Sequence, residues 1–213
     1  MWNELRSGRR FSLGYGKPAA ASAEVCAPVG ISNRHVHLSR QDMDALFGPG
    51  AELTRLKAVK QPGQFAAGET VILRGPRGEL DRVRVLGPLR ARTQVEISQA
   101  DGIKLGLAVP LRMSGDLDGT PGVELVGPGG SVRLEGGLIV AWRHVHMLPE
   151  TAARAGFSDG DLAEALIGGE RGGVMGNVVV RVAAASALEL HIDVEEANAF
   201  SLRNGDMARI RKQ

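Results

Sequence analysis

Short segments in which apolar and polar residues alternate recur along the chain. Val83-Arg84-Val85, Val123-Glu124-Leu125 and Val132-Arg133-Leu134 have the period of two that is typical of β-strands with one buried face. Glycine-rich stretches with the composition of hairpin turns are GPRGEL at 75–80, GPGGSV at 127–132 and GGERGG at 168–173. The pattern predicts a mainly β protein, built from small barrels or sandwiches with a few short helices.

Four short helices are expected, each directly after an apolar segment. Met43, Leu46 and Phe47 form an apolar stripe at helical spacing in the first of them. The predicted starts are Ser39 with Asp42, Ser98 with Asp101, Pro149 in a first turn, and Asp193 with Glu196.

The order of these elements indicates an internal duplication. ISNRHVHLSRQDMDALFG at 31–48 is similar to IVAWRHVHMLPETAARAGF at 139–157, and both contain Arg-His-Val-His. VEISQADGIKLGL at 95–107 is similar to LHIDVEEANAFSL at 190–202. In this alignment Glu96 and His191 occupy the same position.

All five histidines of the chain fall within these repeated segments. Residues i and i+2 of a strand point to the same face, so each His-Val-His directs two imidazoles into one space. A third donor from a neighbouring strand completes a three-ligand site with an open position, the usual form of a catalytic zinc site. The predicted ligand sets are His35, His37 and Glu96, and His144, His146 and His191. Two metal ions per chain are implied, with Zn favoured and Fe, Co or Ni compatible with the same donors.

Composition narrows the classes of function. The 213 residues suffice for one sizeable domain or two small ones. Cys26 is the only cysteine, so no intrachain disulfide can form, and this favours a reducing cytoplasm as the location. The formal charge is +2 without a Lys/Arg tract, which argues against nucleic acid and leaves small anionic ligands open. The lack of a long apolar run argues against a membrane span. Residues 1–24, rich in Gly, Ser, Ala and Arg, are expected to form a flexible extension or a docking segment.

Three further residues are candidates for chemistry. Arg90 ends a strand shortly before Glu96 and could bind phosphate or carboxylate in bidentate fashion. Ser114, in RMSGDL, could line an anion pocket, although Ser-Gly-Asp is equally an ordinary turn. Cys26 could act as an acyl-carrying nucleophile, but a small thiol without a catalytic role is favoured.

Five ordered motifs, GISNRHVHLS, LGPLRARTQVEIS, RMSGDL, RHVHM and LHIDVEEANA, resemble the PduL-type phosphotransacylases, also called phosphate propanoyltransferases, of bacterial microcompartments. The resemblance extends from about Pro28 to Met207. It implies two small duplicated β-barrels capped by short α-helices. We expect the first barrel domain at 33–142, and the second at 25–32 and 143–211.

The resemblance also implies the activity: acyl-CoA, with a propanoyl or acetyl group, plus phosphate is interconverted with acyl phosphate plus CoA. The family's zinc ligands fall on the six residues named above, and its phosphate-binding arginine falls on Arg90. The implied partners are a CoA thioester, phosphate or acyl phosphate, and microcompartment shell or cargo proteins. Residues 1–24 occupy the place of an encapsulation segment, and a homo-oligomer is compatible with the sequence.

Direct attack of zinc-bound phosphate on the thioester is the expected mechanism, with Arg90 or a metal ion stabilising the oxyanion. A dinuclear metal hydrolase that uses water as the nucleophile would need the same six ligands and is the main alternative. A cargo or scaffold protein with structural metals is the non-enzymatic alternative. Three-ligand sets argue against it, because structural zinc is usually held by four protein ligands.

Overall fold

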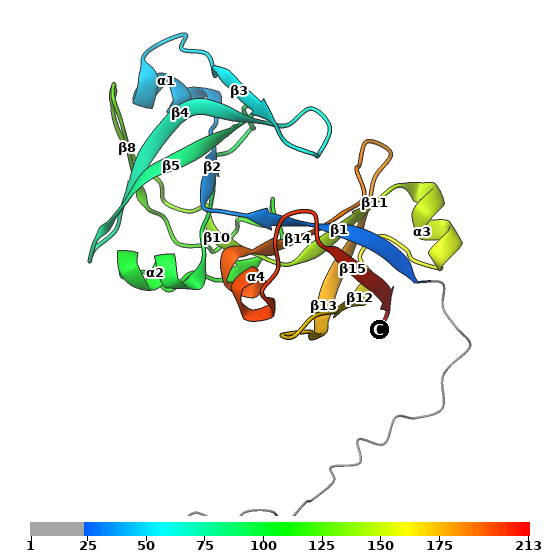
Figure 1. Ribbon diagram of the computed structural model, residues 1–213. Coiled ribbons are helices and arrows are strands. Elements are labelled where there is room, and N and C mark those ends of the chain that lie inside the picture. The colour runs from blue at the N-terminus through cyan, green and yellow to red at the C-terminus, as the bar shows by residue number, and fades with distance from the viewer. Residues whose placement is uncertain (1–23) are drawn as a thin grey trace, which may run out of the picture.

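The computed structural model describes residues 24–213, which form two β-sheets with four short helices around them (Figure 1). One sheet closes into a six-stranded barrel, and the other is an open nine-stranded sheet. The expected mainly β fold is confirmed. The N-terminal sheet curves as a half-barrel without closing, because no strand pairing joins its edge strands β7 and β9.

The barrel contains the first strand of the described chain together with five strands from its C-terminal part. Their order around the barrel is β1 (Val25–Ser32), β14 (Glu189–Asp193), β11 (His144–Met147), β13 (Gly173–Val182), β12 (Leu162–Ile167) and β15 (Met207–Lys212). Apolar residues such as Val145, Val178 and Ile210 fill its interior, and none of these three side chains is exposed to solvent. The barrel therefore has a packed core of its own.

The half-barrel sheet contains the remaining strands. In order they are β7 (Leu111–Arg112), β10 (Leu138–Ala141), β6 (Gln94–Glu96), β2 (His35–His37), β5 (Glu79–Gly87), β4 (Phe65–Arg74), β8 (Glu124–Gly127) and β9 (Gly130–Arg133), while β3 (Arg55–Ala58) pairs with β4. A second apolar core lies under this sheet and includes Val36, Leu73 and Leu125. The three glycine-rich stretches predicted as hairpin turns join β4 to β5, β8 to β9 and β12 to β13.

Strand register confirms the duplication. β2 runs antiparallel to β6 and parallel to β5, and β11 runs antiparallel to β14 and parallel to β13. The strand that precedes each Arg-His-Val-His belongs to the sheet opposite the one that the histidines join. β1 precedes β2 but pairs in parallel with β14 of the barrel, and β10 precedes β11 but pairs in parallel with β6 of the half-barrel sheet. The chain therefore crosses between the sheets twice, immediately before each Arg-His-Val-His. The domain boundaries given above stay a prediction.

The helices begin where the sequence predicts. They are α1 (Arg40–Phe47), α2 (Gln99–Leu105), α3 (Pro149–Ala155) and α4 (Val194–Phe200). Ser98 and Asp193 each form a complete capping box with the residue three positions later. Ser39 accepts from the Asp42 amide, but its own amide donates to Thr93 Oγ1, so this cap is tied to the loop before β6 instead.

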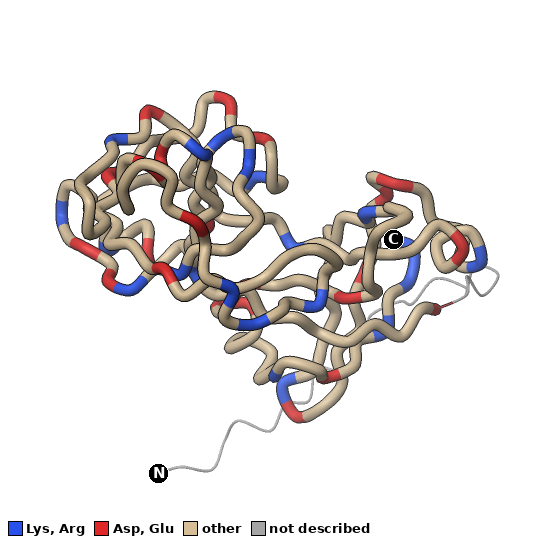
Figure 2. The backbone as a smooth tube through the Cα atoms, turned by 90° about the horizontal axis from the view of Figure 1, so that it is seen from above, with Lys and Arg blue, Asp and Glu red and all other residues tan. Residues whose placement is uncertain are grey.

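Basic and acidic residues are interspersed over both parts of the described chain (Figure 2). Within residues 24–213 no helix is both long and apolar enough to cross a membrane. Apart from Glu24, the predicted extension at 1–24 lies outside the described residues.

Candidate active site

The structure brings together the six predicted metal ligands as two groups of three. His35 lies opposite Glu96 across β2 and β6, and His144 lies opposite His191 across β11 and β14. Within each group, one nitrogen or oxygen from each residue lies within 4.8 Å of the others. The first metal group is His35, His37 and Glu96, and the second is His144, His146 and His191. Equivalent register positions in the two repeats therefore supply the candidate ligands, and this placement is the one that the alignment predicts.

Backbone carbonyl groups orient the leading histidine of each pair. His35 Nδ1 lies 2.8 Å from the Asn33 carbonyl oxygen, and His144 Nδ1 lies 2.7 Å from that of Trp142. His37 Nδ1 is 3.2 Å from the Leu86 carbonyl oxygen. A carbonyl can only accept, so Nδ1 is the donor in each ring, which leaves Nε2 as the nitrogen that can bind a metal ion.

Burial and neighbouring charge keep three of these histidines neutral. Burial, reinforced by positive charge on His35 and Arg90, lowers the pKa of His37 to about 3. Burial and the proximity of His191 lower the pKa of His144 to about 4. The pKa of His146 falls to about 3 because of burial and the proximity of His144, His191 and Arg181. Neutral imidazole is the form that binds metal.

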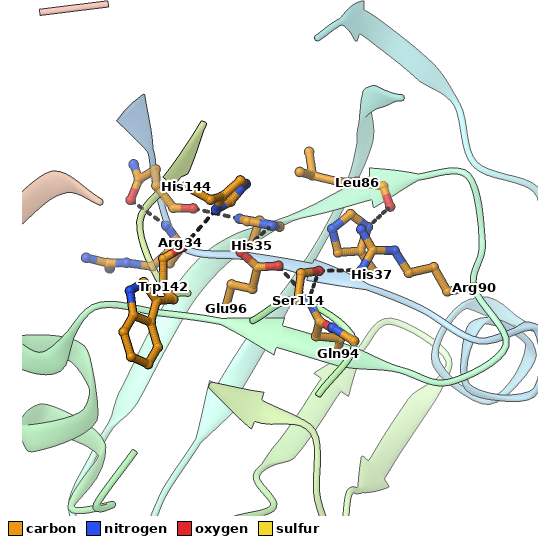
Figure 3. Close-up of polar contacts among 12 residues, drawn as sticks. Arg34, His35, His37, Leu86, Arg90, Gln94, Glu96, Ser114, Trp142 and His144 are labelled. Atoms are coloured by element: carbon orange, nitrogen blue, oxygen red, sulfur yellow. Dashed lines mark hydrogen bonds and ion pairs between the residues drawn. The ribbon is translucent and has the colours of Figure 1, made fainter. Parts of the chain in front are cut away.

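The Glu96 carboxylate is ionised despite its burial. Burial would raise its pKa, but His35, His37 and His144 together hold the pKa well below its usual value. The same pairing acts on His35: burial lowers its pKa, and Glu96, with Oε2 3.4 Å from His35 Nε2, outweighs burial and raises it. His144 lies beside His35 in Figure 3, and both metal groups line the same cavity, so the two groups are close neighbours.

A hydrogen-bond network joins Glu96 to Arg90 (Figure 3). Gln94 Nε2 donates to Glu96 Oε1 at 2.5 Å and to Ser114 Oγ at 2.8 Å, while Gln94 Oε1 accepts from the Gly115 amide at 2.8 Å. Arg90 Nη1 donates to the same Ser114 oxygen at 3.1 Å. Gln94 is 1% exposed, so the centre of the network is buried, and its hydrogen bonds hold Arg90 at a defined position relative to Glu96.

The two metal groups line one cavity of about 550 Å³ between the barrel and the half-barrel sheet. Arg90 and Ser114 also line it, so every predicted site residue faces this space. Arg181 enters from β13, where it lies opposite His146. Burial lowers the pKa of Arg90, and the nearby positive charge of Arg181 lowers it further, against the influence of Glu96. The two guanidinium groups make this part of the cavity suited to an anion.

Cys26 does not belong to the site. It is exposed on β1, opposite Arg209, and does not line the cavity. Arg34 and Arg143, which precede the histidine pairs, each form an ion pair with a carboxylate, and Arg34 also lines the cavity. Arg34 pairs with Asp101 at 2.9 Å and Arg143 with Glu196 at 3.2 Å, and both carboxylates belong to the capping boxes of the helices that follow β6 and β14.

Comparison with known proteins identifies the family of this chain. The family model for phosphate propanoyltransferase matches residues 28–203. The chain belongs to the phosphate propanoyltransferase family. A phosphate propanoyltransferase of Rhodobacter capsulatus is 63% identical over 87% of this chain and 86% of its own length. A protein of the same name from Salmonella typhimurium is 52% identical over 83% of this chain and 84% of its own length. Another from Thermotoga maritima is 50% identical over 85% of this chain and 87% of its own length.

Membership of the phosphate propanoyltransferase family makes the chain a transferase and confirms the resemblance found in its motifs. Sequence reasoning missed Gln94, Glu189 and Arg181, all of which surround the metal groups. Gln94 and Glu189 could have been found, because each lies two residues before a predicted ligand and so shares its face of the strand. Arg181 had no such signal, since only the pairing of β13 with β11 brings it to the site.

Proposed function

We propose that this chain transfers an acyl group between coenzyme A and inorganic phosphate by direct displacement, with propanoyl-CoA or acetyl-CoA as the thioester. Family membership supports phosphate as the acceptor. The single observation that carries the mechanism is the convergence of Arg90, Arg181 and both metal groups on one cavity. The same cavity could serve a metal-dependent hydrolase, but the two arginines beside the metal groups favour an anionic nucleophile over water.

The donors fit a pair of zinc ions. Each group offers three nitrogen or oxygen donors, and carbonyl contacts set the tautomers of His35, His37 and His144 so that a lone pair is free. Metal ions bound there would supply Lewis acid character and neutralise the charge that builds up on oxygen. His35, His37 and Glu96 would hold one ion, and His144, His146 and His191 the other.

Arg90 is proposed to bind phosphate and hold it in line with the thioester carbonyl. Its guanidinium lines the cavity and is fixed on one side by Ser114, which leaves its other N–H groups for two phosphate oxygens. Ser114 Oγ accepts from both Arg90 and Gln94, so its own hydrogen is available to donate to the bound anion. Fixing the nucleophile in this way converts a bimolecular encounter into a near-attack arrangement.

A phosphate oxygen attacks the thioester carbonyl carbon and forms a new carbon–oxygen bond, which gives a tetrahedral adduct. Collapse of this adduct restores the carbonyl group and breaks the bond between carbon and sulfur, so the acyl group leaves on phosphate. CoA leaves as a thiolate, which needs little help from a general acid. The proposed chemistry therefore requires no protein nucleophile and no acyl-enzyme.

The decisive experiment is the initial rate of CoA release from propanoyl-CoA, measured with and without inorganic phosphate. We expect release to require phosphate, to yield propanoyl phosphate in equal amount, and to fall at least about 10³-fold after chelation, since metal charge stabilisation contributes several kcal/mol. Restoring zinc should restore the rate. Equal release with and without phosphate would show that water is the nucleophile and would establish the hydrolase.

Cys26→Ala should leave kcat and KM within about twofold of the wild type, because surface substitutions away from a site have small effects. Rapid mixing should show no burst of CoA release in the absence of phosphate. A phosphate-independent burst that disappears in this variant would contradict direct displacement.

We further propose a cytoplasmic location inside a bacterial microcompartment, with shell or cargo proteins as partners and residues 1–24 as the encapsulation segment. The family resemblance supports this location. A homo-oligomer is part of the same proposal, and sedimentation of the purified chain measures it.

A further inference from the structure

We infer that Glu189 is a positioning residue of the second metal group: it orients His191 and supplies the negative charge that this group's own ligands lack. The inference rests on the proposed function, because it concerns the metal ions proposed there. Glu189 lies on β14, two residues before His191. Its carboxylate Oε2 is 2.6 Å from His191 Nε2.

The two repeats carry their carboxylates at exchanged positions. Gln94 lies opposite His37 in the half-barrel sheet, and Glu189 lies opposite His146 in the barrel, so Gln94 and Glu189 are equivalent in register. The first group has an acidic ligand, Glu96, beside the neutral Gln94. In the second group the ligand is the neutral His191 and its neighbour is acidic. Each group thus has one carboxylate in contact with a histidine ring.

This exchange matters for the charge of the two sites. A divalent ion held by three neutral imidazoles keeps its full charge, whereas one held by two imidazoles and a carboxylate is partly neutralised. A carboxylate hydrogen-bonded to a ligand histidine makes that imidazole more basic and partly compensates for the difference. Glu189 would therefore bring the second group closer to the electrostatic balance that Glu96 gives the first.

The contact also selects a tautomer. Glu189 accepts from Nε2 of His191, so the proton lies on Nε2 and the lone pair on Nδ1. His35 and His144 have the opposite tautomer, because their Nδ1 atoms donate to backbone carbonyls. His191 is therefore oriented through a hydrogen bond to a side chain, whereas the Nδ1 atoms of His35 and His144 are held by backbone carbonyls.

The surroundings of Glu189 are built to hold it in place. It is only 9% exposed, and its oxygens also meet Gln61 Nε2 at 3.5 Å and Lys60 Nζ at 3.7 Å, both from the loop between β3 and β4. Gln61 is itself fixed, since its amide group donates to the Ala187 carbonyl oxygen and accepts from the Ala187 amide. Gly30 on β1 leaves room for the Glu189 side chain, because a Cβ at position 30 would lie only 2.7 Å from Glu189 Cδ.

The test measures metal stoichiometry and affinity of Glu189→Gln, which keeps an acceptor oxygen but loses the charge, and of Glu189→Ala, which loses both. We expect about 10- to 100-fold weaker binding of one zinc ion in a chelator competition, with the other unchanged, and a larger loss for alanine than for glutamine. Long-range ¹H–¹⁵N spectra of the zinc-loaded protein should show the Nε2-protonated form for His191 and its loss in Glu189→Ala.

Glu164→Gln is the matched control, because Glu164 lies on barrel strand β12, pairs with Arg211 at 2.6 Å and does not line the cavity. It should bind both ions as the wild type does. Two ions bound with unchanged affinity in both Glu189 variants would overturn the inference and leave the proposed function intact. A wild-type protein that binds no ion would overturn both.

Discussion

Replacing Arg90 with alanine is expected to lower kcat/KM for phosphate by about 10²- to 10³-fold, the usual cost of losing a donor that stabilises developing charge. Arg90 lines the cavity with both metal groups and is held there by Ser114. Lysine at this position should recover little activity, because it keeps the charge but not the planar fork that binds two oxygens. The measurement is the initial rate of acyl phosphate formation as a function of phosphate concentration.

Arg92 offers a matched control two residues further along the same loop. Its side chain is 64% exposed and pairs with Asp118 at 3.2 Å, outside the cavity. Arg92→Ala should have wild-type kinetics. If Arg90→Ala binds phosphate normally and keeps its rate, the anion is held elsewhere, and Arg181 becomes the residue to change.

Much of the fold was predictable from local signals. Alternation identified strands such as β5 and β8, glycine-rich turns identified three hairpins, and caps at Ser98 and Asp193 identified helix starts. These signals act over a few residues, so the sequence displays them directly. Whether a sheet closes into a barrel depends on pairing between strands that are distant in the sequence. Local signals therefore could not distinguish the closed barrel from the open half-barrel sheet.

The metal groups were predictable because the duplication supplied a second copy of the same pattern. A single His-Val-His says little, but aligning the repeats placed Glu96 at the position of His191, and strand register agrees with that alignment. Gln94 and Glu189 were missed. They are equivalent in register, but neither is a histidine or is matched by one in the other repeat, so the comparison that found the candidate ligands drew no attention to them.

Removing one ligand from either metal group should remove one metal ion and nearly all activity. We expect Glu96→Ala and His146→Ala each to bind one zinc ion per chain instead of two, and to lose about 10³-fold or more in kcat, because several kcal/mol of charge stabilisation is lost at the reacting oxygen. Elemental analysis and steady-state rates measure the two effects. Loss of the Glu96 carboxylate also leaves the Gln94 amide without one acceptor, so Glu96→Gln is needed to separate metal loss from unfolding.

Glu79 provides the control for these variants, since it is an exposed glutamate on β5 that pairs with Arg74 away from the cavity. Glu79→Ala should keep two ions and full activity. Retention of both ions by Glu96→Ala would remove Glu96 from the ligands, and Glu96 would then serve only to hold His35 through their contact. Loss of one ion with activity preserved would mean that one group is structural, so that a single ion and Arg90 suffice for the transfer. Loss of activity in both variants, each with one ion left, would show that the two groups act together, as their shared cavity leads us to expect.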